Sequence, residues 1–220
     1  MIPVRYAGAL VMALVLAACG SGATDRSASS SSPTTTTSST PTMTPAPPPP
    51  PGKPMAFRDY LASIGVTGTP ARFDNTPGLQ VTVPIPDGWT RAGDPLFATG
   101  IDFVQPLGGK GTYPSATLMA IALNGDFDPK DAIHHANTDA LPPTATNRTE
   151  SFEDYQGFPS AAAQGVSGTS QHYSRIVIAT VPSDGKRYLV QLTVTTLVDQ
   201  PIAASPALSS IISGFKVTVT

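Results

Sequence analysis

The side chains of this chain that could carry out chemistry are few, and they do not form a familiar catalytic set. Ser183 and Lys186 have the Ser-x-x-Lys spacing in which a lysine can activate a serine nucleophile. That chemistry needs the serine at the start of a helix, whereas the Asp-Gly pair between these residues predicts a hairpin turn. The chain also has no Gly-x-Ser-x-Gly segment. The serine residues therefore do not indicate a hydrolase.

Aspartate and histidine side chains are the remaining candidates for a metal or acid-base site. Asp126, Asp128 and Asp131 lie close in sequence but lack the glycine and the distal glutamate of a calcium loop. Because His134 and His135 are adjacent, they would point about 100° apart on a helix and could not chelate one ion together. We therefore predict no metal, no cofactor and no enzymatic activity. A hydrolase that uses His135 and Asp126 is the least favoured alternative.

Charge and cysteine content exclude other classes of protein. The 220 residues include 13 Lys and Arg against 15 Asp and Glu, a net charge of -2. Charged residues make up 13% of the chain, about half of the roughly 25% found in an average soluble protein. Nucleic-acid binding is excluded because it requires clustered positive charge. A single cysteine, Cys19, excludes an intramolecular disulfide framework.

The position of Cys19 predicts that it carries a lipid. An uncharged, mostly apolar run from Tyr6 to Ala18 follows Arg5 and is too short to span a membrane, which takes about 20 residues. Such a run is typical of a secretory signal peptide. The segment Leu16-Ala17-Ala18-Cys19 resembles the bacterial lipobox, which implies cleavage after residue 18 and acylation of Cys19. We therefore expect residues 1–18 to be removed and the protein to be anchored on the outer side of the plasma membrane.

A tether of simple composition separates this anchor from the folded part of the chain. Ser, Thr and Pro account for 24 of the 34 residues from Gly20 to Lys53. Because few of these side chains could bury apolar surface, residues 19–53 are predicted to be disordered. The tether would span about 30 Å as a coil and about 105 Å when fully extended. Its run of threonines, Thr34 to Thr37, is a candidate for O-glycosylation.

Residues 54–220 have the pattern of an α+β domain. Phe57, Tyr60, Leu61 and Ile64 have helical spacing before Gly65, and Asp128-Pro129 is a helix start followed by apolar positions up to Ala140. A third helix is predicted from Pro201 or Pro206 to Gly214. Strands are predicted at 79–84, 97–104, 115–123, 144–153, 160–166, 172–181, 187–196 and 215–219. Successive strands with helices at the start, middle and end predict a largely antiparallel sheet flanked by helices.

Several segments of this domain occur in the order found in one family. They are the helix Phe57 to Leu61, the strand and turn from Gly78 to Trp89, Gly125 to Pro129, Phe158 to Ala161, and the strand Tyr188 to Thr195. Together they resemble the LpqN/LpqT family of mycobacterial lipoproteins over about residues 55–219. The resemblance implies a Mog1/PsbP-like fold, a curved antiparallel sheet flanked by helices. It also implies a role in cell-envelope lipid assembly without an established catalytic motif.

Aromatic side chains are the candidates for ligand binding. Trp89 is the only tryptophan, and Phe97 and Phe103 lie on a predicted strand close to other apolar strand positions, namely Ile101, Leu118 and Ile121. These side chains could line a groove for an apolar ligand, although packing in the core is the simpler explanation for them. We expect the domain to bind an amphipathic ligand such as a glycolipid. The alternative is an adaptor that binds a protein partner in the envelope.

Replacing Cys19 tests the predicted anchor. We expect Cys19→Ala to move the protein from the membrane fraction of cells to the soluble fraction, because acyl chains would be its attachment to the bilayer. Fractionation without detergent followed by immunoblotting measures this. A Cys19→Ala protein that stays in the membrane fraction would contradict the prediction.

Overall fold

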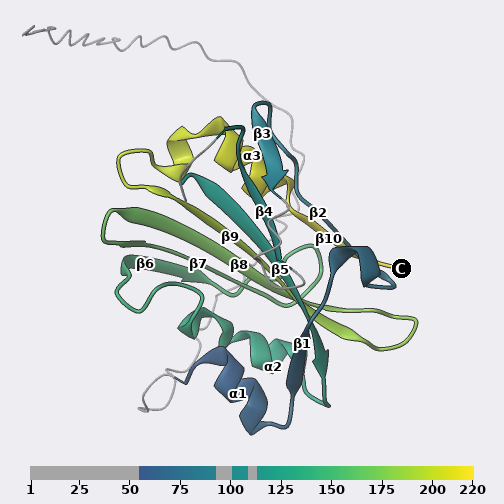
Figure 1. Cartoon of the computed structure of the whole chain (residues 1–220). Coiled ribbons are helices and arrows are strands. Elements are labelled where there is room, and N and C mark those ends of the chain that lie inside the picture. Colours follow the sequence, from purple (N-terminus) through teal and green to yellow (C-terminus); the bar gives the residue numbers. More distant parts are fainter. Residues whose placement is uncertain (1–54, 93–100, 109–112) are drawn as a thin grey trace, which may run out of the picture. The chain divides into compact units, whose positions relative to one another are not determined.

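Strand pairing organises the part of the chain that the structure describes. The structure, a computed structural model, describes residues 55–92, 101–108 and 113–220. In these residues eight strands form one antiparallel sheet in the order β3-β4-β5-β9-β8-β7-β6, with β1 paired to β5 beyond the end of β4 (Figure 1). These strands are β1 (Thr67–Pro70), β3 (Trp89–Ala92), β4 (Ile101–Pro106), β5 (Ser115–Asn124), β6 (Thr146–Ser151), β7 (Ser160–Ser167), β8 (Ser170–Thr180) and β9 (Arg187–Leu197). A separate ribbon pairs β2 (Leu79–Thr82) with β10 (Lys216–Val219).

One face of the sheet packs against the C-terminal part of the domain. Helix α3 (Pro206–Gly214) places Leu208 and Ile211 against this face, and Phe215 follows them. The short 3-10 helices η1 (Phe73–Asn75) and η3 (Ile202–Ala204) lie in the connections before β2 and α3. The sheet contributes alternate positions of its central strands, among them Leu118 and Val190. This set of buried side chains is called the first core below.

The opposite face packs against the N-terminal and middle helices. Phe57 and Leu61 of α1 (Phe57–Ser63) meet Ile133 of α2 (Pro129–Ile133) and Ala136 of the 3-10 helix η2 (Ala136–Thr138). The sheet positions beneath them, including Ile176, Ile178 and Leu189, are the ones that alternate with those of the first core. This set is called the second core. The two cores explain why β8 and β9 carry apolar side chains on both faces.

Local signals in the sequence determine how several elements begin and end. The Asp128 carboxylate accepts a hydrogen bond from the Lys130 amide at 2.8 Å, which caps α2 as predicted. Gly185 has a φ of 69° in the hairpin between β8 and β9, so Ser183 to Lys186 form a turn. This conformation is unfavourable for a residue with a side chain. The α+β class and the antiparallel sheet flanked by helices are confirmed.

Some elements differ from their predictions. The helix predicted to continue from Asp128 to Ala140 is broken, because backbone hydrogen bonds such as His135 N to Ala132 O shift to three-residue spacing after α2. The strand predicted at 97–104 is found at Ile101–Pro106, and residues 97–100 lie outside the described residues. The short strands β1 and β3 were not predicted, because neither has enough alternation to stand out from a loop.

Removing a side chain from the first core tests how much it stabilises the fold. Leu208 is fully buried, so we expect Leu208→Ala to lower the free energy of unfolding by about 2–5 kcal/mol through lost burial and a new cavity. The exposed neighbour Ser210 is the matched control, and Ser210→Ala should change it by less than about 0.5 kcal/mol. Chemical denaturation followed by circular dichroism measures both values. Equal midpoints for the two variants would contradict this account of the core.

Candidate functional site

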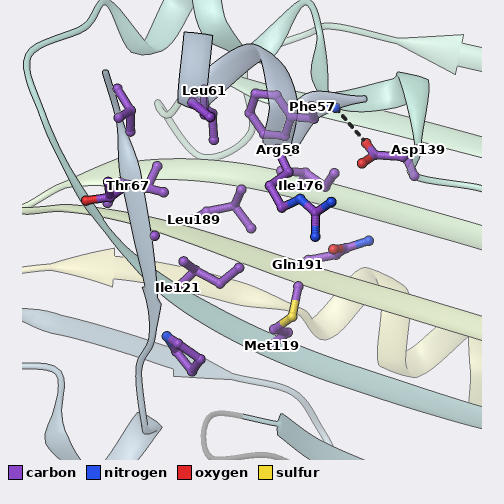
Figure 2. Close-up of a pocket in the computed structure, with 16 residues that line it drawn as sticks. Phe57, Arg58, Leu61, Thr67, Met119, Ile121, Asp139, Ile176, Leu189 and Gln191 are labelled. Carbon is purple, nitrogen blue, oxygen red and sulfur yellow. Dashed lines mark hydrogen bonds between the residues drawn. The ribbon is translucent and has the colours of Figure 1, made fainter. Parts of the chain in front are cut away.

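A cavity of about 590 Å³ lies between α1, β1 and the face of the sheet that carries the second core (Figure 2). Most of its lining is apolar. The apolar side chains come from α1, from the segment that follows it, and from β5, β8 and β9, and include Phe57, Leu61, Val66, Met119, Ile121, Leu123, Ile176 and Leu189. The cavity therefore matches the general character of small-molecule sites, which are concave, mostly apolar and about 300–1,000 Å³ in volume.

The close approach of β1 to β5 forms one wall of the cavity. Gly65, with a φ of 78°, ends α1 and turns the chain into β1, which then runs antiparallel to β5. Gly68 pairs with Leu123, and a Cβ atom at position 68 would lie 2.8 Å from Cγ2 of Ile121. Only glycine lets the two strands approach without moving that side chain. Gly68 thus determines the width of the cavity on this side.

Four polar or charged residues interrupt the apolar lining: Arg58, Thr67, Asp139 and Gln191. The Phe57 amide donates a hydrogen bond to Oδ1 of Asp139 at 3.3 Å, which joins the start of α1 to the segment after η2. Arg58 lies 3.6 Å from the Asp59 carboxylate and is almost fully exposed. In Figure 2, Arg58 and Gln191 lie on the side of the cavity away from Thr67. Arg58 is thus a solvent-exposed cation at the edge of the cavity with an acidic side chain beside it.

A row of neutral polar side chains continues along the same face of the sheet beyond the cavity. The register places Thr117, Thr193 and Ser174 side by side on β5, β9 and β8, next to Gln191. Gln191 Nε2 donates hydrogen bonds to Ser174 Oγ at 3.0 Å and to Thr193 Oγ1 at 3.3 Å. One row further, Thr195 Oγ1 lies 3.4 Å from His172 Nδ1. These six residues are called the polar ladder below.

The three aromatic candidates from the sequence do not meet in one site. Trp89 packs against the first core, on the opposite face of the sheet from the cavity. Phe103 pairs with Thr117, so it lies on the same face as the cavity and beside the polar ladder, but it does not line the cavity. Phe97 and Cys19 lie outside the described residues. Leu118, which we had grouped with Ile121, belongs to the first core, because two strand residues three positions apart point to opposite faces.

The candidates for acid-base or metal chemistry are held in structural contacts. His135 stacks on the Tyr60 ring with 3.7 Å between the ring centroids, and His134 contacts Phe152. The Asp126 carboxylate lies 3.8 Å from the Arg187 guanidinium. No group of three or more His, Cys, Asp or Glu side chains in the described ranges is placed to hold a metal ion. The contacts of these side chains therefore favour roles in joining helices and strands.

The residues that form the cavity were largely missed by sequence reasoning. Ala62, Gly68, Met119, Leu189 and Gln191 come from four separate elements, and none belongs to a chemical motif. The available signal was the alternation along β5 and β9, which places Met119 with Ile121 and Leu189 with Gln191 on one face. Alternation does not indicate which part of that face a helix covers. The position of the cavity therefore could not be predicted.

Comparison with known proteins identifies the family. The family described as "Probable lipoprotein LpqN" matches residues 53–218 of this chain. The chain belongs to this family. The LpqT lipoprotein of Mycobacterium leprae is similar, with 41% identity over 171 residues, covering 75% of this chain and 77% of that protein. LpqT of Mycobacterium tuberculosis H37Rv is 37% identical over 173 residues, or 74% of each chain.

A solved structure supports the fold of this LpqN-family chain. The crystal structure of LpqN from Mycobacterium tuberculosis, described as involved in cell envelope biogenesis, superimposes with a TM-score of 0.59 at 20% identity. The match covers 76% of this chain and 99% of that one. At this identity the match establishes a shared fold. Within the described residues, no helix is long and apolar enough to cross a membrane.

The pH dependence of stability tests whether His172, a partly buried residue of the polar ladder in this LpqN-family domain, is held neutral in the folded state. Burial lowers the pKa of His172 below its ordinary value of 6.5, so the folded state favours the neutral imidazole. Its contribution to stability is therefore fully present above about pH 6.5 and is lost as the pH falls below that value. We expect His172→Asn to reduce the loss of stability between about pH 7 and pH 5. Urea denaturation at several pH values measures this, and parallel pH profiles for both proteins would contradict it.

Proposed function

We propose that this LpqN-family domain binds an amphipathic ligand of the glycolipid type and does not catalyse a reaction. The observation that carries the proposal is the position of the polar ladder, which begins where the apolar cavity ends, on the same face of the sheet. An apolar chain in the cavity would place its headgroup at the half-buried Gln191 and Thr193, while the buried Ser174 holds the Gln191 amide in position. The two parts of the site match the two parts of such a ligand.

The cavity suits an aliphatic chain. Burying one methylene group contributes about 0.8 kcal/mol, so ten methylenes would contribute about 8 kcal/mol before the costs of association and ordering. Phe57, Leu61 and Leu189 are buried, so their positions are determined by packing before a ligand arrives. A site that is formed in advance loses little free energy on ordering when the ligand binds.

The polar ladder suits a neutral headgroup that carries hydroxyl groups. Its side chains are hydroxyls, one amide and one imidazole whose lowered pKa favours the neutral form. Hydroxyl and amide groups both donate and accept hydrogen bonds, as sugar hydroxyls do. A phosphate would be favoured by uncompensated positive charge, but Arg58 lies beside Asp59, and the cavity lining also includes Asp139. A polyol headgroup therefore fits better than an anionic one.

The cellular role that we propose combines this site with the predicted anchor. The related LpqN is described as involved in cell envelope biogenesis, and the relatives of this chain are named lipoproteins. We propose that acyl chains at Cys19 hold the domain on the outer side of the plasma membrane, where it supports the assembly or transport of envelope lipids. The polar groups that line the cavity, Arg58, Thr67, Asp139 and Gln191, include no histidine. The contact between Thr195 and His172 in the polar ladder lies two rows of the sheet beyond Gln191, and the ladder contains no acidic side chain to orient the imidazole. This supports binding without catalysis.

Dodecyl maltoside below its micelle concentration is a suitable probe, because it joins one alkyl chain to a neutral sugar. We expect Ala62→Trp, which places a large ring at the cavity wall, to raise its Kd at least about tenfold, or 1.4 kcal/mol. The next residue, Ser63, is also exposed but does not line the cavity, so Ser63→Trp should change the Kd by less than about twofold. Isothermal titration calorimetry measures the affinities, and thermal unfolding confirms that both variants fold.

Two further ligands separate the contributions of chain and headgroup. Maltose should bind far more weakly than dodecyl maltoside, because it lacks the alkyl chain, and dodecyl phosphate should also bind more weakly, because the polar ladder offers no uncompensated cation. If the unmodified protein binds none of the alkyl ligands, or if Ala62→Trp and Ser63→Trp bind equally, the proposed site is wrong. The adaptor alternative would then take its place.

A further inference from the structure

Four exposed apolar side chains lie at one end of the sheet and have no part in either core. They are Ile85, Leu107, Tyr113 and Val198, and between 43% and 73% of the surface of each is exposed. They occupy three connections of the chain: the turn between β2 and β3, the two sides of the connection between β4 and β5, and the turn after β9. These four residues are called the apolar rim below.

Hydrogen bonds and strand register bring the four residues to the same end of the sheet. The Leu107 amide donates a hydrogen bond to the Gly88 carbonyl at 2.7 Å, which joins the end of β4 to the turn that follows Ile85. Ser115 pairs with Thr195 at the start of β5, so Tyr113 and Val198 extend past the same end of two neighbouring strands. The labels β3, β4 and β9 in Figure 1 show this end of the sheet, which lies away from α1 and α2.

We propose that the apolar rim rests on the lipid surface to which the chain is tethered, with its side chains in the interfacial region of the bilayer. The proposal rests on the proposed anchor at Cys19. The tether of 34 residues from Gly20 to Lys53 would span about 30 Å as a coil, so the anchored domain can turn any of its ends to the bilayer. Such tethering gives an effective concentration in the millimolar range, at which even weak apolar contacts are populated.

The side chains of the apolar rim suit a bilayer better than a rigid protein partner. They project from three separate connections of the chain. Isolated leucine, isoleucine and tyrosine side chains on loops can each enter the interfacial layer independently, and tyrosine is favoured there. The acyl chains at Cys19 would supply the stable attachment, so the apolar rim needs to add only a weak contact that determines the orientation of the domain.

The charges beside the apolar rim indicate which lipid surface it would favour. Asp87 and Asp199 are both exposed and lie in the same connections as Ile85 and Val198, and the sequence of the connection with Leu107 and Tyr113 contains one basic residue, Lys110, so acidic residues outnumber basic ones in these connections. Acidic groups so close to a bilayer would be repelled by anionic headgroups, so a neutral or zwitterionic surface should be preferred. This orientation would also bring the polar ladder close to the bilayer, because β5 and β9 carry it between the apolar rim and the cavity.

A matched pair of single substitutions tests the orientation. The chain from Cys19 to Thr220 is coupled through its Cys19 thiol to a maleimide lipid in phosphatidylcholine vesicles, so tethering does not depend on cellular lipidation. Leu107→Trp places a tryptophan on the apolar rim, and Ile64→Trp places one at an exposed apolar position at the end of α1. Brominated phosphatidylcholine quenches a tryptophan that enters the bilayer. The unsubstituted chain supplies the background from Trp89.

We expect at least about threefold more quenching, and a blue-shifted emission, for Leu107→Trp than for Ile64→Trp. Replacing part of the phosphatidylcholine with phosphatidylglycerol should reduce the quenching at position 107. Equal quenching at the two positions, no quenching at 107, or quenching that increases with phosphatidylglycerol would each overturn the proposal. The binding of dodecyl maltoside in solution is a separate measurement. If the protein binds the maltoside but position 107 is not quenched, only the proposal for the apolar rim is wrong. If position 107 is quenched but the protein does not bind the maltoside, only the proposed cavity ligand is wrong.

Discussion

The alternation of side chains along β9 is the constraint on which the rest of the domain depends. One face of this strand is apolar along most of its length, with Tyr188, Val190, Leu192 and Val194 all buried in the first core. The other face carries Arg187 and then Leu189 in the second core, and changes to Gln191, Thr193 and Thr195 further along. Because burying polar groups is costly unless all of them are hydrogen-bonded, it is unfavourable for the apolar helices of the second core to extend over this part of the face. The change from an apolar to a polar side chain between Leu189 and Gln191 therefore favours an end of the helical layer at this point, which leaves this side of the cavity open.

The cavity itself results from a mismatch between a short helix and a wide sheet. Helix α1 has seven residues, and only Phe57 and Leu61 of these are buried against the second core. On one side the space is closed by β1, which Gly68 allows to approach Ile121, and on another by the hydrogen bond between Phe57 and Asp139. On these two sides, the cavity is therefore bounded by the positions of the β1 backbone and of the start of α1. A larger side chain at position 62, on the cavity wall, would occupy part of this space.

The long strands, the α2 cap and the hairpin turn could be predicted because each depends on neighbouring residues. Alternation located β5, β7, β8 and β9, and Asp128-Pro129 marked the start of α2. The cavity depends instead on which residues from separate elements share a face and on how far a helix extends over that face. Our grouping of Leu118 with Ile121 was wrong for a reason visible in the sequence, since an odd spacing in a strand reverses the side chain. For Trp89 the sequence favoured packing against the sheet over contact with a ligand, because a single tryptophan after a Pro-Asp-Gly turn more often packs, and the structure places it against the first core.

The low charge of the chain and the position of its ion pairs indicate which interactions stabilise the domain. The ion pairs in the described residues, such as Arg72 with Asp74 and Lys186 with Asp184, lie at the surface, where solvent screens the attraction between the charges. Stability must then come mainly from apolar burial in the two cores. In a domain stabilised in this way, an unfilled apolar cavity lowers stability, because its lining lacks contacts that a packed core would have. A ligand that binds only the folded state would restore those contacts and stabilise the fold by an amount that rises with the logarithm of its affinity. The cavity thus supports the proposal that the domain binds a ligand with an apolar part.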